Sequence, residues 1–144
     1  MMNVSPLLDP VVALVAWSCV MLIWLAFTRF RGMARAGVKI GVQRGGRGQD
    51  LEGVLPPEAN WPAHNYAHLM EQPTIFYAIV FALILMGFDQ PINVYLAWGY
   101  VALRIVHSLV QATFNDVRVR FPLFVLASLC LLSLTIHAGL RLWS

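Results

Sequence analysis

Apolar residues gather into four long stretches, separated by polar or glycine-rich segments. From these stretches we predict helices at about residues 7–30, 62–88, 91–114 and 121–142. A helix rises about 1.5 Å per residue, so each is long enough to cross a hydrocarbon core of roughly 30 Å. No segment alternates polar and apolar residues, which argues against β-strands. The pattern predicts an all-α membrane protein, an up-down bundle of four transmembrane helices.

Prolines stand near the expected helix starts, at Pro10, Pro62, Pro91 and Pro122. A proline fits the first helical turn because N–H groups there have no acceptor within the helix, so the lack of one costs nothing. Short connections follow the second and third helices, so we expect these neighbours to pack antiparallel. The first stretch has no basic segment before it, and arginines rather than a cleavage site follow it. It therefore predicts a retained helix, not a signal peptide.

The composition supports a membrane location. Of the 144 residues, 59% are hydrophobic and only 12% charged, and the mean hydropathy is +0.68. So small a soluble domain cannot bury that much apolar surface, which excludes a soluble enzyme and a disordered chain. We expect residues 1–144 to form one membrane domain. Cys19 and Cys130 lie in apolar stretches and are interpreted as packing residues.

The basic residues predict the orientation in the membrane. Most of them fall in the connection after the first helix and in the turn before the fourth, and lysine and arginine accumulate on the cytoplasmic side of membranes. We therefore expect a multi-pass protein of a bacterial inner membrane, with both termini outside and these two connections in the cytoplasm. The residues are Arg29, Arg31, Arg35, Lys39, Arg44, Arg47, Arg118 and Arg120.

The connection at about residues 37–60 is rich in glycine and proline and has no periodicity. Such a composition is typical of a flexible loop. The same segment can instead fold over a site at the cytoplasmic face as a lid. The sequence leaves both alternatives open.

Two predicted helices carry polar residues at helical spacing. On the second, His64, His68 and Glu71 share one face. Ionisable groups at membrane depth normally face the bundle interior or a water-filled cavity. With the turn centred between Asp89 and Gln90, Glu71 lies level with His107, and Arg104 lies slightly deeper. We therefore expect a buried charged cluster of Glu71, Arg104 and His107. The stripe on the third helix consists of Arg104, His107, Gln111, Asn115 and Arg118.

Metal binding is an alternative function for the same residues. His64, His68 and Glu71 present two imidazoles and a carboxylate on one face, with His107 opposite, and such groups bind zinc or iron. The chain has only 4 histidines, fewer than membrane di-iron enzymes require, so we predict no metal site.

Three motifs carry a family resemblance. They are NYAHLMEQPTIFY at 65–77, ALRIVHS at 102–108 and RVRFP at 118–122. Together they resemble the MAPEG family, the membrane-associated proteins of eicosanoid and glutathione metabolism, of a bacterial type. The resemblance covers roughly residues 60–140. It implies a homotrimer of four-helix subunits that binds glutathione, as co-substrate, at the cytoplasmic side of the subunit interfaces.

The resemblance also implies roles for individual residues. Arg120 falls near the arginine that lowers the pKa of the glutathione thiol, which makes it the candidate catalytic residue, with Arg118 second. Arg29, Arg104 and His68 are candidates for holding the carboxylates of glutathione.

Other positions either match the family or depart from it. Glu71 matches the family glutamate and is a candidate for the amino group of glutathione or for orienting Arg104. His107 matches the motif on the third helix. Gln111 stands where catalytic members carry tyrosine, His68 replaces an asparagine, and Ala67 replaces a ligand-contacting arginine.

From these observations the sequence predicts a glutathione-dependent transferase or peroxidase that acts on lipophilic electrophiles. The alternative is a non-catalytic member of the same family that binds a lipid or an anionic ligand, or serves as an accessory subunit of a membrane complex. The expected partners are membrane lipids, a lipophilic small molecule and two further copies of the chain, with no nucleic acid.

Overall fold

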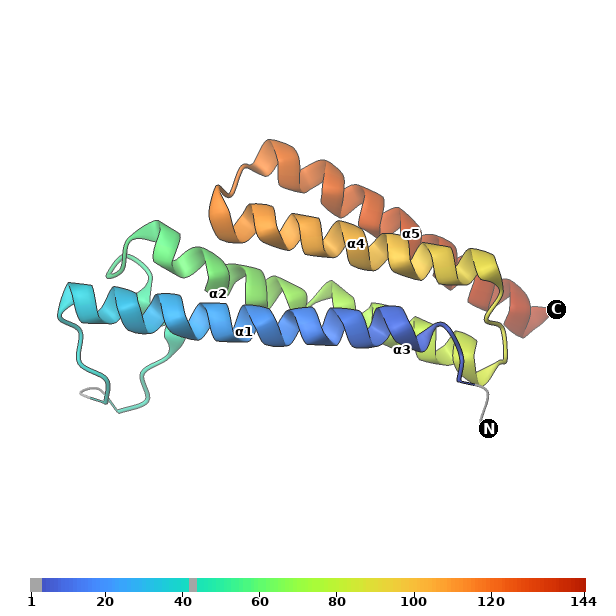
Figure 1. The fold of residues 1–144 in the computed structure, drawn as a ribbon, viewed down its shortest axis with the longest axis horizontal. Coiled ribbons are helices and arrows are strands. Elements are labelled where there is room, and N and C mark those ends of the chain that lie inside the picture. The colour runs from blue at the N-terminus through green and yellow to red at the C-terminus, as the bar shows by residue number, and fades with distance from the viewer. Residues whose placement is uncertain (1–3, 42–43) are drawn as a thin grey trace.

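The computed structural model describes residues 4–41 and 44–144 and is all-helical (Figure 1). Helix α1 (Leu8–Ala36) is followed by a short 3₁₀ helix, η1 (Gly48–Leu51). Helices α2 (Pro57–Leu69) and α3 (Gln72–Leu85) come next and lie end to end. Helices α4 (Pro91–Thr113) and α5 (Val117–Trp143) complete the fold.

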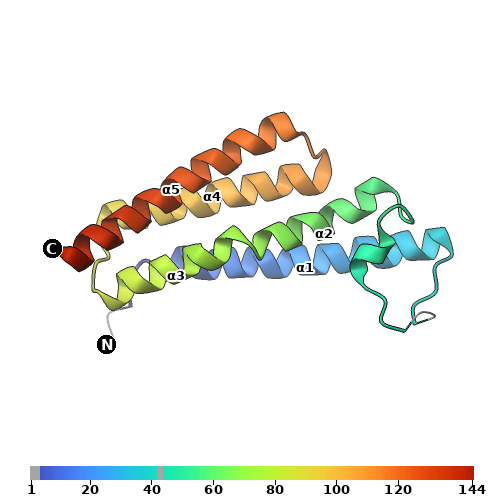
Figure 2. The same ribbon diagram turned by 180° about the vertical axis from the view of Figure 1, so that it is seen from behind.

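The helices form a bundle of four columns, with α2 and α3 sharing one column. Helix α1 runs beside the α2–α3 column, α4 packs against α1 and α2, and α5 packs against α4 and α3 (Figures 1 and 2). Helix α1 begins and α5 ends at the same end of the bundle, opposite the α1–α2 connection and the α4–α5 turn (Figure 1). We call the end with these two connections the loop end.

Three of the columns are long and apolar enough to cross a membrane: α1, the stretch Pro57–Leu85, and α5. The fourth, α4, is long enough, but its buried residues include Asn93, Arg104, His107 and Gln111. Helix α4 packs against α1, α2 and α5, so its polar face lies inside the bundle. Large apolar side chains such as Ile23, Leu85 and Tyr95 are exposed instead, which is the arrangement expected of a surface covered by lipid.

Helix bounds differ from the sequence prediction at several points. Helix α1 continues to Ala36, and α2 begins at Pro57 rather than at residue 62. Pro62 and Pro122 do not mark helix starts but lie inside α2 and α5, more than one turn beyond the observed starts at Pro57 and Val117. The true start of α5 has its own signal, because the side chain of Asp116 accepts a hydrogen bond from the backbone N–H of Arg118 at 2.8 Å.

The expected single helix over residues 62–88 is interrupted at Met70 and Glu71. Pro73 explains the interruption: it has no backbone N–H, and its ring excludes the carbonyl of Leu69 that a continuous helix would place beside it. The helix restarts at Gln72, with Pro73 in the first turn, where no N–H is needed. Because irregular backbone at membrane depth must find hydrogen-bond partners, this break organises the polar residues around it.

Candidate functional site

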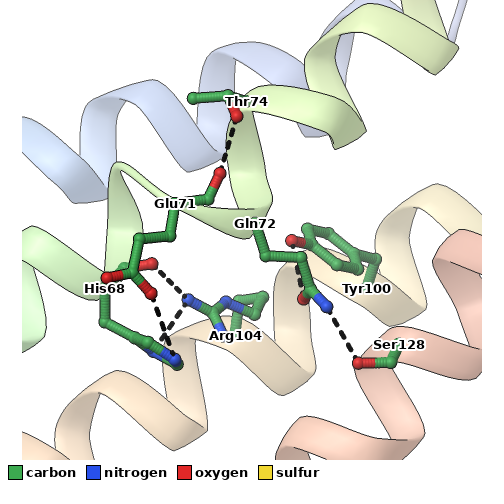
Figure 3. Close-up of polar contacts among 7 residues, drawn as sticks. All are labelled: His68, Glu71, Gln72, Thr74, Tyr100, Arg104 and Ser128. Atoms are coloured by element: carbon green, nitrogen blue, oxygen red, sulfur yellow. Dashed lines mark hydrogen bonds and ion pairs between the residues drawn. The ribbon is translucent and has the colours of Figure 1, made fainter.

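Arg104 of α4 supplies hydrogen bonds at the helix break. Its side chain is fully buried, and Nη2 donates to the carbonyl oxygen of His68 at 3.1 Å (Figure 3). That carbonyl belongs to the last turn of α2, where unpaired carbonyls carry partial negative charge and a cation is stabilising. The guanidinium also lies 5.9 Å from the ring centre of Phe124 on α5, within cation–π range. Arg104 thus joins α2, α4 and α5 at the interruption.

The second contact of Arg104 fixes the tautomer of His68. Nη2 lies 3.2 Å from Nδ1 of His68, and a guanidinium has only donors. Nδ1 must therefore accept, which leaves the ring proton of the neutral imidazole on Nε2. That N–H faces Glu71, whose Oε2 lies 4.0 Å from Nε2. His68 consequently offers a hydrogen-bond donor at the break, on a side chain that is 27% exposed.

His68 lies within a group of rings that limits its movement. The ring of His107 stacks on it, with centroids 5.1 Å apart, and Phe124 packs on it at 5.5 Å. His107 itself is buried, and its Nδ1 has no hydrogen-bond partner among the residues described. His107 therefore supports the imidazole of His68 from α4 and is largely enclosed by its own chain.

The expected buried cluster is wrong in its acidic member. The Glu71 side chain is 69% exposed, and Arg104 forms no ion pair within 4 Å among residues 4–41 and 44–144. The expectation assumed a continuous helix, whereas the break at Glu71 directs its carboxylate outward. The carbonyl oxygen of Glu71 remains inside the turn and accepts a hydrogen bond from the Thr74 hydroxyl at 2.6 Å (Figure 3).

Polar contacts that the sequence did not suggest hold α3 at its start. The amide of Gln72 donates to the Ser128 hydroxyl on α5 at 2.9 Å, and Tyr100 on α4 donates to the Gln72 oxygen at 3.2 Å (Figure 3). Gln72 belongs to the polar residues of the second predicted helix, but Tyr100 and Ser128 are single polar groups in apolar stretches. No periodic signal identifies them.

A second polar network crosses the bundle nearer the loop end. The Ser108 hydroxyl accepts from the side chains of Asn65 and of Trp17, the latter at 2.9 Å. Gln111 is buried one turn further along α4, and its Oε1 has no partner in the described part of the chain. Gln111, like Arg104, is therefore enclosed by its own subunit and is not presented to a ligand there.

Arg120 is half-buried on the first turn of α5, and its Nε is enclosed without a hydrogen-bond partner among the described residues. It stands one helical turn before Phe124, the ring that packs on His68. Arg118 on the same turn is exposed. Of these two arginines, Arg120 is therefore the one enclosed by the bundle on the turn next to Phe124.

Arg29 does not contact His68 or Glu71. Its side chain binds the connection between α1 and α2 instead. Its Nη2 donates to the carbonyl of Gly48 at 3.0 Å, and Glu52 contacts His64 of α2. We call residues 47–52 the strap. The strap, α1 and α2 border an open pocket of about 530 Å³, so this part of the connection packs on the helices. His64 is thereby paired with the strap rather than with His68.

Cleavage by trypsin tests the strap. Arg29→Ala removes a hydrogen bond to a charged group, worth about 1.5 kcal/mol, so the strap should open about tenfold more often. We expect cleavage after Arg47 to accelerate by that factor relative to cleavage after Arg44, measured by mass spectrometry. Arg31→Ala, which changes an exposed arginine of the same helix, should leave the ratio unchanged. An unchanged ratio in Arg29→Ala would show that the strap is held by other contacts.

In the described ranges, no group of three or more histidine, cysteine, aspartate or glutamate side chains is arranged to hold a metal ion. The remaining histidine, His137, lies on α5 towards the other end of the bundle, where its Nδ1 is 2.7 Å from Oδ1 of Asn93.

Comparison with known proteins identifies a family. The model of the MAPEG family matches residues 7–140, nearly the whole chain. No curated protein and no solved structure matches.

Proposed function

This chain belongs to the MAPEG family, and on that basis we propose that it is a membrane-bound glutathione transferase or peroxidase that acts on lipophilic electrophiles. The family is one of membrane proteins in glutathione and eicosanoid metabolism, and the three apolar columns support the membrane location.

The observation that carries the proposal is the half-buried Arg120, one helical turn from the Phe124 ring that packs on His68. It forms no ion pair within 4 Å in the part of the chain described, and its Nε is enclosed without a partner. A cation held in this way at a membrane boundary favours a bound anion, because burial weakens the competing solvation by water. His68 adds a neutral N–H donor nearby, and Glu71 adds an exposed carboxylate.

This set of groups suits glutathione, which has two carboxylates, an amino group and a thiol. When bound, glutathione supplies the sulfur nucleophile. Arg120 stabilises the thiolate and so lowers the pKa of the thiol, whose proton passes to water. A carbon–sulfur bond then forms on the electrophile as the bond to its leaving group, such as chloride, breaks. Glu71 accepts the amino group, Arg118 attracts a carboxylate, and the Nε2–H of His68 donates to the bound tripeptide.

Arg104 and Arg29 take supporting roles in this proposal. Arg104 is fully buried and positions His68, and Arg29 is engaged by the strap. The exposed carboxylate of Glu71 lies on a face of the bundle that membrane lipid would otherwise cover, and polar groups at such depth need protein or water around them. A homotrimer in which a neighbouring subunit covers this face meets that need.

Binding and turnover measured together test the function. We expect glutathione to raise the unfolding temperature of the purified protein in detergent, and the protein to conjugate 1-chloro-2,4-dinitrobenzene. Stabilisation without turnover of any electrophile between pH 6 and pH 9 would favour the non-catalytic, ligand-binding alternative. Absence of both effects would overturn glutathione chemistry altogether.

His68 provides a finer test, because an asparagine can reproduce both of its contacts. The amide oxygen can accept from Arg104 while the amide N–H₂ faces Glu71, as Nδ1 and Nε2 do now. We expect kcat/KM of His68→Asn to stay within about threefold of wild type, and His68→Ala to lose about tenfold, the effect of one hydrogen bond. Equal losses in both variants would contradict a role as a simple donor.

A further inference from the structure

A groove lies between the last turns of α1 and the segment of residues 54–59 that leads into α2. Its volume is about 540 Å³. Gly32 forms part of its lining, and a Cβ there would lie 3.3 Å from Leu55 and 3.4 Å from Ala59. The absence of a side chain at Gly32 therefore lets the two walls approach closely. The groove is lined by Thr28, Arg31, Gly32, Arg35, Ala36, Val54, Pro56, Glu58 and Ala59.

The groove carries two cations on one wall. Arg31 and Arg35 are four residues apart on α1, so they project from the same face. Both are exposed, and neither forms an ion pair within 4 Å among the described residues. Glu58 on the opposite wall is the acidic residue of the lining, which leaves the groove with a net charge of +1 by formal charges, from two arginines and one glutamate.

The surrounding side chains place the groove at the edge of the lipid. Phe27 is 62% exposed one turn before Arg31, and the guanidinium of Arg31 lies 6.0 Å from its ring centre. Arginines near a helix end extend their charged groups towards the headgroup level, while an exposed apolar ring one turn earlier suits the acyl chains. A ligand in the groove therefore meets cations at one end and the ring of Phe27 beside it.

We propose that this groove binds the phosphodiester headgroup of an anionic phospholipid, with Arg31 and Arg35 on the phosphate oxygens and the acyl chains along Phe27. Arginine is well suited to phosphate because its planar donors match the geometry of the oxygens. A net charge of +1 complements the single negative charge of a phosphodiester. None of the residues assigned to glutathione lines the groove, so this site is independent of the proposed activity.

Lipid titration followed by native mass spectrometry tests the site. The full-length protein in detergent is titrated with phosphatidylglycerol, and the bound fraction gives a Kd. We expect the double variant Arg31→Gln/Arg35→Gln to bind at least about tenfold more weakly, since each basic residue at a membrane surface contributes substantially to anionic lipid binding. The matched control Lys39→Gln/Arg44→Gln removes the same charge from the connection that follows α1, outside the groove, and should remain within about twofold of wild type.

A second variant keeps the test decisive if the double variant folds poorly. Ala36→Glu adds a negative charge to the rim without removing a contact, and it should weaken phosphatidylglycerol binding to a similar extent. Wild-type affinity in Ala36→Glu, or equal losses in the groove variant and its control, would overturn the proposal. Equal affinity for phosphatidylcholine would overturn the preference for an anionic lipid. Displacement by inorganic phosphate at comparable concentration would instead show a site for free phosphate.

Discussion

Arg104→Ala is expected to lower the free energy of unfolding in detergent by about 3 kcal/mol or more. The substitution removes the donor for the His68 carbonyl and for Nδ1 of His68, and hydrogen bonds to charged groups contribute about 1.5–3 kcal/mol. It also leaves a cavity in the bundle, because the Arg104 side chain is fully buried. Thermal unfolding of the purified variant measures this loss of stability. A low yield of folded protein would indicate a still larger loss.

Two further variants separate this explanation from the charged cluster predicted by the sequence. Glu71→Ala should cost less than about 1 kcal/mol, because its carboxylate is exposed and 4.0 Å from the nearest imidazole nitrogen. Arg104→Gln, which keeps an amide donor, should be less damaging than Arg104→Ala. A loss in Glu71→Ala as large as that in Arg104→Ala would restore the buried pair and contradict the geometry described above.

Arg120→Ala is expected to reduce glutathione conjugation by about 10²-fold or more. Removing one electrostatic donor beside a reacting atom typically has an effect of this size. The loss should appear mainly in kcat/KM near neutral pH. The pH–rate profile should also move to higher pH, because the thiol loses its nearest cation and ionises less readily. Initial rates with 1-chloro-2,4-dinitrobenzene between pH 6 and pH 9 measure both effects.

Arg118→Ala is the matched control for Arg120. Both arginines lie on the first turn of α5, but Arg118 is exposed while Arg120 is half-buried. We expect Arg118→Ala to change glutathione binding modestly and to leave the pH–rate profile in place. Unchanged activity in Arg120→Ala, with a large loss in Arg118→Ala, would keep the enzyme and transfer the activating role to Arg118.

His68 shows how a departure from the family pattern is accommodated in this fold. The family resemblance implies an asparagine where this sequence has His68, and the sequence alone does not say which hydrogen-bonding group His68 presents. The contact with Arg104 determines which group His68 presents. Because the guanidinium of Arg104 has only donors, Nδ1 of His68 must accept, and the N–H is left on Nε2. Asparagine and this tautomer of histidine then offer the same pair of groups, one acceptor towards Arg104 and one donor towards the break.

The sequence by itself determined the class of the protein and most of its helices. In a membrane, an apolar stretch of about 20 residues or more can pair its backbone N–H and C=O groups only by forming a helix. The number and approximate ends of the helices therefore follow from length and hydropathy. Helix α4, predicted at 91–114, is observed at Pro91–Thr113. The motifs around Glu71, Arg104 and Arg120 also predicted the family, which the match over residues 7–140 confirms.

The tertiary structure decided which polar groups meet. Helical spacing predicted an ion pair between Glu71 and Arg104. Pro73 breaks the helix and turns the Glu71 carboxylate outward, so the Arg104 guanidinium donates to the carbonyl oxygen of His68 instead. The pairing of Arg29 with Gly48 links residues 19 positions apart in the sequence, and that of Trp17 with Ser108 links residues 91 apart. Periodicity reports only which face of one helix a residue occupies. The partner on that face depends on how the columns pack and on where the backbone leaves the helix, and neither is encoded in local spacing.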